Sequence, residues 1–372
     1  MKKIFSLFLT IIIFSHFIAE VHSQIPSNDS IPAAGTFARD TLKIIKQARN
    51  IVITGVGDIM LGTSFPSAKY LPPHDNPFLL LESVADTLKS SDITFGNLEG
   101  SFLDVGEAAK KCRDTTICYL FRMPERYISA LTATGFDILS LANNHFGDFG
   151  PVAREKTKSI LDSVGIKYAG LIEYPWSIFS KDSLLYGFCA FAPNAGTMDI
   201  NNIDSAASIV RMLKDTCDIV IVSFHGGAEG KDFQNVPRIP EIYHNEQRGD
   251  VYKFAHAMID NGADVVFGHG PHVTRAIEVY RERFISYSLG NFCTYGRFNL
   301  AGPNSLAPIV RLNVDQDGKF LSGRIIPAFQ PWPGGVKYDS NKLVIKKIKE
   351  LTAVDFPESL INISEDGKIT YK

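Results

Sequence analysis

The sequence has no excess of charge of one sign and contains few cysteines. Its 372 residues include 38 lysines and arginines against 40 aspartates and glutamates, for a formal net charge of −2. Proteins that bind nucleic acid usually carry a basic patch or stripe, so this balance argues against nucleic acid as a partner. The five cysteines include no Cys-x-x-Cys pair, which argues against a zinc site made of thiolates.

Long apolar runs are also scarce, and the run at the N-terminus is short. Residues 4–17 are mostly apolar and follow Lys2 and Lys3, and Val21-His-Ser23 places small residues where a signal peptidase cleaves. This pattern predicts a signal peptide over residues 1–23 and an exported protein in the periplasm or cell envelope. The run is shorter than a membrane span, although an uncleaved anchor is the alternative. No cysteine follows it that could carry a lipid.

Export would make disulfide bonds possible. Cys112 and Cys118 lie close together in a polar loop and are expected to pair once the protein is exported. The other three cysteines lie in or beside apolar segments, which favours buried, unreactive thiols: Cys189, Cys217 and Cys293.

After a polar leader over 24–47, apolar strand-like segments alternate with helical patterns, which is typical of an α/β fold. Strands are expected at 50–57, 92–96, 138–142, 166–170, 184–191, 218–224 and 264–267, and then at 276–280, 284–289, 309–314 and 320–326. Helices are expected at 77–90, 124–134, 151–164, 204–214 and 247–261. These elements predict two sheets packed face to face with helices outside, in one domain over 48–335. A peripheral tail is expected over 336–372.

Five of the predicted strands end on side chains that commonly bind metals. In chain order these are Asp58; Asn97 and Glu99; Asn144 and His145; His225 and Glu229; and His269 and His272. In open α/β sheets, ligands bind at the carboxyl ends of the strands, so the side chains are expected to converge. Imidazole, carboxylate and amide oxygen suit zinc, manganese or iron. The pattern therefore predicts one or two divalent metal ions. Taken singly, each residue could instead cap a turn or lie in solvent.

The same segments carry a series of motifs that resembles a known family. They are Gly57-Asp-Ile-Met-Leu-Gly62, Asn97-Leu-Glu-Gly100, Ala142-Asn-Asn-His145, Gly268-His-Gly-Pro-His-Val273 and Tyr287-Ser-Leu-Gly-Asn-Phe292. In this order they resemble the CapA-type bacterial capsule synthesis proteins, or poly-γ-glutamate capsule proteins. The resemblance implies a four-layer α/β/β/α sandwich of the calcineurin-like metallophosphatase type. It also implies a role in making or exporting an anionic polymer, with other capsule-synthesis membrane proteins as candidate partners.

The resemblance also assigns roles to single residues. Together with the strand-end pattern, it gives as metal ligands Asp58, Asn97, Glu99, Asn144, His225, His269 and His272. His145 would act as the general acid, and Asn144 would bind both metal and substrate. Glu229, Arg122 and Arg275 are candidate substrate-binding residues, although ordinary ion pairs are the alternative for both arginines. The chain departs from the phosphoesterase pattern at Met60, where a histidine is usual, and a full two-metal site would lose a ligand there.

Two functions remain open at this point. One is an exported metal-dependent hydrolase that acts on a phosphoester or an amide of an envelope polymer. The other is a capsule factor without catalytic activity, which uses the same fold to bind polymer or proteins.

Overall fold

The computed structural model describes residues 49–111 and 118–371. The predicted signal peptide and leader lie outside these ranges, as does Cys112, so the pairing of Cys112 with Cys118 stays a prediction. The other three cysteines are buried and free, as expected from their apolar surroundings.

The larger of two main sheets has a parallel centre. Its spatial order is β20 (Ile361–Ile363), β21 (Lys368–Tyr371), β17 (Phe320–Ile326), β16 (Ile309–Val314), β1 (Ile51–Met60), β2 (Ile93–Leu98), β5 (Ile138–Ser140) and β6 (Lys167–Ala169). Strands β1, β2, β5 and β6 are parallel to one another, whereas β16 pairs with the first half of β1 in the antiparallel sense. The second half of β1 pairs instead with the parallel strand β15 (Asn291–Thr294).

The second sheet has six strands and also has a parallel centre. Its order is β13 (Ile277–Tyr280), β14 (Arg283–Ser286), β12 (Val265–His269), β9 (Ile219–His225), β8 (Leu184–Phe191) and β7 (Trp176–Lys181). Short two-stranded pairs join β3 (Ser101–Phe102) to β4 (Arg122–Met123), β10 (Ile242–Tyr243) to β11 (Glu246–Gln247) and β18 (Ala328–Phe329) to β19 (Lys337–Tyr338).

The two main sheets pack face to face through one apolar core. Alternate residues of each strand face this core, as the two-residue period of a strand requires: Ile219 and Ile221 of β9 face inward, whereas Val220 and Val222 belong to the outer cluster. Phe95 of β2 stacks on Phe267 of β12 with ring centroids 5.0 Å apart. Strands buried on both faces explain the continuous apolar runs of the sequence.

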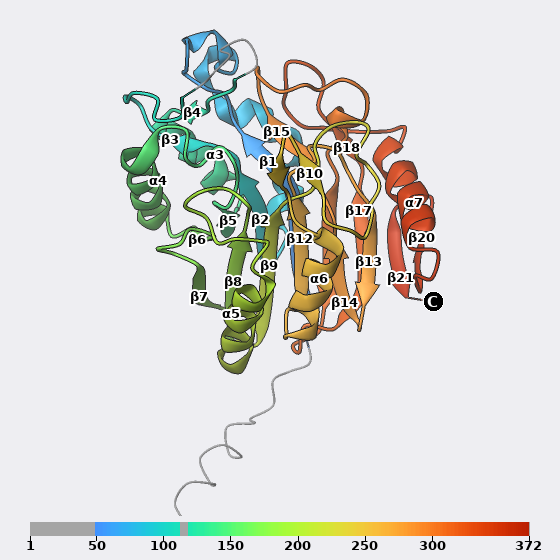
Figure 1. The fold of residues 1–372 in the computed structure, drawn as a ribbon. Coiled ribbons are helices and arrows are strands. Elements are labelled where there is room, and N and C mark those ends of the chain that lie inside the picture. The colour runs from blue at the N-terminus through green and yellow to red at the C-terminus, as the bar shows by residue number, and fades with distance from the viewer. Residues whose placement is uncertain (1–48, 112–117, 372) are drawn as a thin grey trace, which may run out of the picture. The chain divides into compact units, whose positions relative to one another are not determined.

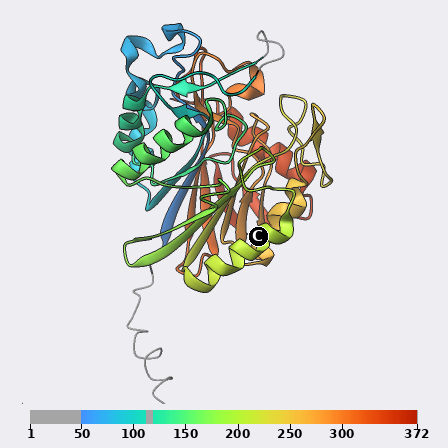
Figure 2. The same ribbon diagram turned by 60° about the vertical axis from the view of Figure 1, so that its left-hand side comes forward.

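Helices cover the outer face of each sheet (Figures 1 and 2). On the large sheet, α2 (Ala85–Lys89), α3 (Ile128–Ala133) and α4 (Gly150–Val164) contribute to a second apolar cluster. On the six-stranded sheet, α5 (Ile203–Thr216) and α6 (Val251–Asp260) contribute to a third. The order of layers is helix, sheet, sheet, helix, so the predicted α/β/β/α sandwich is confirmed.

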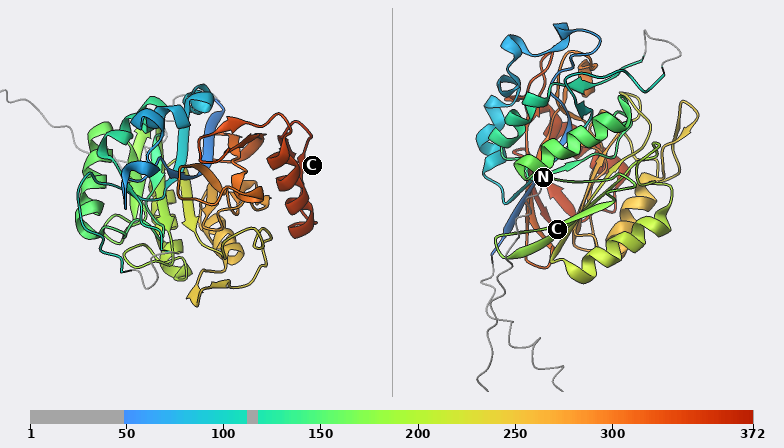
Figure 3. Two further views of the ribbon diagram at one scale, coloured as in Figure 1. Left: turned by 90° about the horizontal axis from the view of Figure 1, so that it is seen from above. Right: turned by 90° about the vertical axis from the view of Figure 1, so that its left-hand side faces the viewer.

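The C-terminal segment joins this arrangement at one edge. β21 pairs with β17 and extends the large sheet, and α7 (Leu343–Asp355) places Val344, Ile345 and Ile348 in the core between the sheets. In the view from above in Figure 3, α7 (red) and α4 (green) lie at opposite edges of the sandwich.

Two of the predicted helices were wrong in part, because they begin as 3-10 turns. The segment 77–90 contains η3 (Pro77–Leu80) and η4 (Glu82–Val84) before α2, and α3 follows η5 (Glu125–Tyr127). Leu81 and Val84 have φ angles of −115° and −114°, which interrupt a regular helix. Further 3-10 turns are η1 (Ala68–Tyr70), η2 (Pro73–Asp75) and η6 (Gly302–Ser305).

Candidate metal centre

The carboxyl ends of the parallel strands bring the predicted ligands together. Asp58 of β1 is directly opposite Asn97 of β2, and His225 of β9 is directly opposite His269 of β12. Glu99 follows β2 by one residue. All five side chains are buried. The sheet register therefore places these polar groups at one end of the sandwich, as the sequence predicts.

Asp58 lies at the centre of the group. Its Oδ1 accepts a hydrogen bond of 2.8 Å from Asn97 Nδ2 and lies 3.2 Å from His269 Nδ1. Its Oδ2 accepts a hydrogen bond of 2.9 Å from His272 Nδ1. The neighbouring Gly57 allows this placement, because a Cβ atom there would lie 2.0 Å from the carbonyl oxygen of Gly290.

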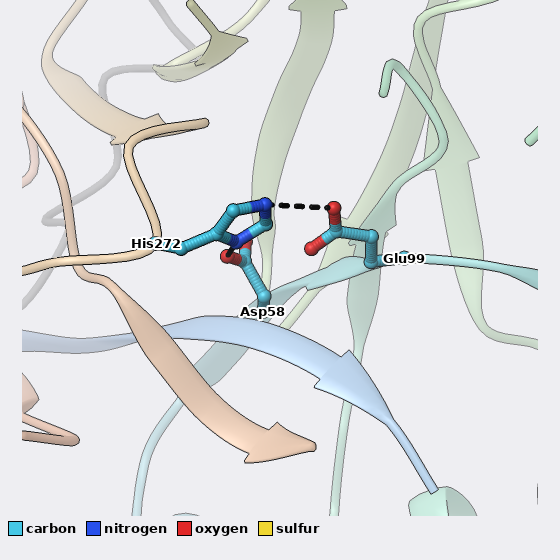
Figure 4. A group of neighbouring side chains, drawn as sticks. All are labelled: Asp58, Glu99 and His272. Atoms are coloured by element: carbon cyan, nitrogen blue, oxygen red, sulfur yellow. Dashed lines mark hydrogen bonds and ion pairs between the residues drawn. The ribbon is translucent and has the colours of Figure 1, made fainter. Parts of the chain in front are cut away.

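Asp58, Glu99 and His272 form a triad that could hold a metal ion (Figure 4). One ligand atom from each residue lies within 4.8 Å of the others, and Glu99 Oε1 lies 3.5 Å from His272 Nε2. The ring of His225 is close to this triad, with its centroid 6.2 Å from that of His272. This distance is compatible with ligands of shared or adjacent ions.

Several buried polar atoms of the group have no hydrogen-bond partner in the described part of the chain. They are both carboxylate oxygens of Glu99, both ring nitrogens of His225 and of His269, and Oδ1 of Asn144. Two of these atoms, His269 Nδ1 and Glu99 Oε1, have an ion-pair contact only, with Asp58 and His272. Buried polar atoms are nearly always hydrogen-bonded, and exceptions need an explanation. A divalent cation fits this donor set, because its members are the nitrogen and oxygen ligands that such ions bind.

Burial and neighbouring charges shift the pKa values of these groups in different directions. Burial alone would raise the pKa of Asp58, but contacts with His269 and His272 lower it well below its usual range. Burial raises the pKa of Glu99 well above its usual range. Burial, together with the charge of Arg248, lowers the pKa of His225. Burial opposes ionisation of His272, yet Glu99 and Asp58 raise its pKa to about 10. The hydrogen bond between His272 and Asp58 therefore favours the charged form of both groups.

The loop that carries His272 is held in an unusual conformation. His272 has a φ of 57°, in the left-handed region that few non-glycine residues adopt. Its carbonyl oxygen accepts hydrogen bonds of 3.2 Å from Asn291 Nδ2 and 3.3 Å from Asn304 Nδ2. These two amides fix the loop and so direct the imidazole toward Asp58.

His145 lies beside the group and makes its own contact with a carboxylate. Its Nδ1 donates a hydrogen bond of 2.8 Å to Asp148 Oδ2, and its ring contacts Phe121 with centroids 4.2 Å apart. Asp148 is completely buried and also accepts from the Phe121 backbone N–H. An Nδ1 bonded to a carboxylate fixes the ring and leaves Nε2 for another partner.

A comparison with protein families identifies the group to which the chain belongs. The model of the family described as "Bacterial capsule synthesis protein PGA_cap" matches residues 52–176 and 191–295, which is more than half of the chain. The chain belongs to this family.

Curated relatives are 27–29% identical to this chain over the aligned residues. The Capsule biosynthesis protein CapA of Bacillus anthracis is 27% identical over 267 residues, which cover 66% of this chain and 60% of that protein. The PGA biosynthesis protein CapA of Bacillus subtilis (strain 168) is 28% identical over 340 residues, which cover 85% of this chain and 80% of that protein. A Probable polyglutamine synthesis accessory protein of Mycobacterium tuberculosis is 29% identical over 245 residues and 59% of this chain.

Similar solved structures are more distant. A hypothetical protein from Thermus thermophilus has a TM-score of 0.46 at 14% identity and covers 76% of this chain and all of that one. A structure named "Putative 5'-Nucleotidase" from Staphylococcus aureus has a TM-score of 0.44 at 14% identity and covers 82% of this chain and 58% of that one. Within residues 49–111 and 118–371, no helix has the length and hydropathy needed to cross a membrane.

Met60 stands where phosphoesterases usually have a histidine, and it contributes no ligand in this PGA_cap family member. The side chain is completely buried and belongs to the apolar cluster between the large sheet and its helices.

Asn97 fits a positioning role better than the predicted ligand role. Its Nδ2 donates to Asp58, and its Oδ1 accepts a hydrogen bond of 3.2 Å from Asn143.

Two predicted substrate contacts do not fit the positions of their side chains. Arg275 is completely buried and donates two hydrogen bonds of 2.8 Å to Glu241 and one of 2.8 Å to the carbonyl oxygen of Phe233. Arg122 donates to the carbonyl oxygen of Gly106 and to Ser64 Oγ. Both arginines therefore hold loops together. Arg275 does so through an ion pair, the alternative that the sequence left open, whereas Arg122 bonds to a carbonyl oxygen and a hydroxyl.

Replacing Arg275 by glutamine is expected to destabilise the fold by roughly 3–5 kcal/mol, because Glu241 would remain buried without its partner. Chemical denaturation measures this loss. Arg324→Gln is the control, since Arg324 pairs with Asp366 where both side chains are about half exposed, and such pairs contribute roughly 0–1 kcal/mol. Equal stability of the two variants would contradict the structural role of Arg275.

The sequence assigns no role to several other residues of the site. Asp148 and Asn143 lie within the Asn-His motif region, and only the fold shows that their side chains contact His145 and Asn97. Arg248 lies in a segment without any motif, yet its Nη2 is 2.8 Å from Glu229 Oε1 at the edge of the site. Glu229, predicted to bind substrate, does line the cleft beside Asn144.

Proposed function

We propose that this protein is a metal-dependent hydrolase of the cell envelope that acts on phosphoester or amide bonds of an anionic capsule polymer. The observation that supports this proposal is the set of buried nitrogen and oxygen atoms without hydrogen-bond partners, among the described residues, at one end of the sandwich. Membership of the PGA_cap family supports the role in capsule synthesis. Export rests on the predicted signal peptide.

The residues would divide the work as follows. Asp58, Glu99, His225, His269 and His272 would hold manganese, zinc or iron. When bound, such an ion activates water and polarises the scissile group. Asn97 holds the Asp58 carboxylate through its 2.8 Å hydrogen bond.

The remaining steps fall to the cleft residues. Asn144 Oδ1, buried without a partner in the described chain, is placed to contact metal or substrate. Asp148 holds the His145 ring so that Nε2 can protonate the leaving oxygen or nitrogen. This proton transfer turns a poor leaving group into a neutral alcohol or amine.

A capsule factor without catalysis is the second candidate. The observation that favours it is Met60, which lies in the apolar cluster and leaves one metal position with fewer ligands. In this case the same cleft would bind polymer, and any metal would be structural.

Two measurements on the purified protein test the proposal. We expect bound transition metal in the isolated protein, and hydrolysis of an aryl phosphate or a γ-glutamyl anilide that stops in a chelator and returns with manganese. Protein that contains metal but hydrolyses neither probe under any metal condition would favour the non-catalytic candidate. Protein that stays metal-free in manganese, zinc and iron would overturn the proposed centre.

A further inference from the structure

The cleft at the candidate metal centre has two halves. One half has a volume of about 480 Å³ and the other of about 580 Å³, and each is in the size range of small-molecule sites. Asn144 and Glu229 line both halves, whereas His145 and His272 line only the larger one. The halves therefore meet beside the metal centre, and a long ligand could extend from it in two directions.

Arg154 lines the smaller half of the cleft. Among the described residues, its guanidinium has no carboxylate partner. It projects from α4, and its Nη2 donates a hydrogen bond of 3.2 Å to the carbonyl oxygen of Ala195. Its Nε is buried and has no partner in the described chain. Gly196 leaves the necessary room, because a Cβ atom there would lie 2.3 Å from Arg154 Nη1. Gly147 approaches the same guanidinium, since a Cβ atom built on it would lie 3.1 Å from Nη2.

Arg297 takes the corresponding position in the larger half. Its guanidinium lies over the rings of Tyr70 and Tyr119, 4.9 Å from each centroid. Its Nη2 donates a hydrogen bond of 3.4 Å to the carbonyl oxygen of Cys118. Among the described residues, it too has no carboxylate within ion-pair distance. Stacking fixes the plane of the guanidinium while leaving its charge uncompensated.

The charge of the lining differs from that of the whole chain. Lys110 lines both halves and Lys111 the larger one, although the chain has a formal net charge of −2. Two of these cationic residues have carboxylate partners. Arg248 lies 2.8 and 3.5 Å from Glu229 and Glu246, and Lys110 Nζ lies 3.4 Å from Asp148 Oδ1. Among the described residues, positive charge without a carboxylate partner therefore lies in both halves of the cleft, at Arg154 and at Arg297, and the halves meet beside the proposed reaction centre.

We infer that the cleft contains two anion subsites, built on Arg154 and on Arg297, and that a polymer with repeated carboxylates lies across both. This inference rests on the proposed function for its reaction centre. A small phosphate monoester would need cationic groups on one side of the reacting bond only. Cations on both sides suit an internal stretch of a polyanionic chain, whose anionic groups continue in both directions from the metal.

Binding measurements with poly-γ-glutamate and with free glutamate test the two subsites. We expect Arg154→Gln and Arg297→Gln each to weaken polymer binding about three- to tenfold, as for partly exposed charge contacts, and the double variant to lose the product of both factors. Added salt is expected to reduce the difference between variants and wild type. Free glutamate, which fills one subsite at a time, is expected to bind far more weakly than the polymer.

The matched control is Arg211→Gln. Arg211 is an exposed arginine of α5 that bonds to Asn261 and Ser208 and has no carboxylate partner in the described chain. Losses no larger than that of Arg211→Gln would overturn the inference, and a loss in only one of the two cleft variants would overturn its two-sided form. Because binding is measured in chelator, without turnover, the result does not depend on hydrolysis. Polymer binding by a protein without hydrolase activity would sink the proposed catalysis and leave the subsites standing.

Discussion

Replacing His269 by alanine is expected to lower metal affinity by at least about 100-fold, more than the loss of an outer-shell contact, while the fold stays intact. The imidazole is completely buried, and neither ring nitrogen has a hydrogen-bond partner in the described chain. It lies 3.2 Å from Asp58, and its ring contacts only the edge of the apolar core at Phe95, with centroids 5.5 Å apart. Its removal therefore takes away a ligand and one ring contact with the core. Metal content after dialysis against dilute manganese or zinc measures the effect. His272→Ala is expected to behave in the same way.

His256→Ala provides the matched control for a lost histidine. His256 is also largely buried, with 16% of its side chain exposed. It lies away from the cleft on α6, where its Nε2 is 3.0 Å from Glu278 Oε2. We expect this variant to retain metal as the wild type does. Equal metal content in all three variants would contradict the assignment of His269 and His272, and circular dichroism would show whether any loss comes from unfolding.

The general fold and the convergence of the site could be predicted from the sequence, because both depend on local pattern. Continuous apolar runs such as residues 219–222 are typical of strands buried on both faces. Parallel strands bring their carboxyl ends to one edge, so a polar residue after each run must lie near the others. The registers of Asp58 with Asn97 and of His225 with His269 follow from this rule.

The roles of the arginines could not be predicted in this way. Arg275 and Glu241 are 34 residues apart, and nothing in their local sequences indicates that the two side chains form a buried pair. Arg154 and Arg297 belong to segments without a recognised motif, and their cleft positions depend on the packing of α4 and of the chain after β15. The fold decides which charged side chains come into contact. A local sequence pattern therefore shows where an arginine lies in the chain but not which carboxylate it pairs with.

Replacing His145 by alanine is expected to lower turnover by roughly two to four orders of magnitude, the usual contribution of a general acid, with metal content nearly unchanged. The side chain is largely buried and bonds to Asp148 through Nδ1, and no bond links it to the Asp58, Glu99 and His272 triad in the described chain. Turnover of an aryl phosphate with a poor leaving group, measured beside metal content, separates the two effects. The drop should be smaller for a leaving group that needs no proton.

Asp148→Asn tests whether the pair acts as a unit. The amide keeps the shape of the carboxylate, and its one oxygen can still accept the bonds from His145 Nδ1 and the Phe121 N–H, which both go to Oδ2. It removes the negative charge that stabilises a protonated imidazole. We expect a smaller loss of turnover than in His145→Ala, and little further loss when both changes are combined, because residues that act together are not additive. If the double variant instead loses the product of the two single effects, Asp148 does not act through His145. If His145→Ala retains full turnover with a poor leaving group, protonation by His145 is not part of the reaction.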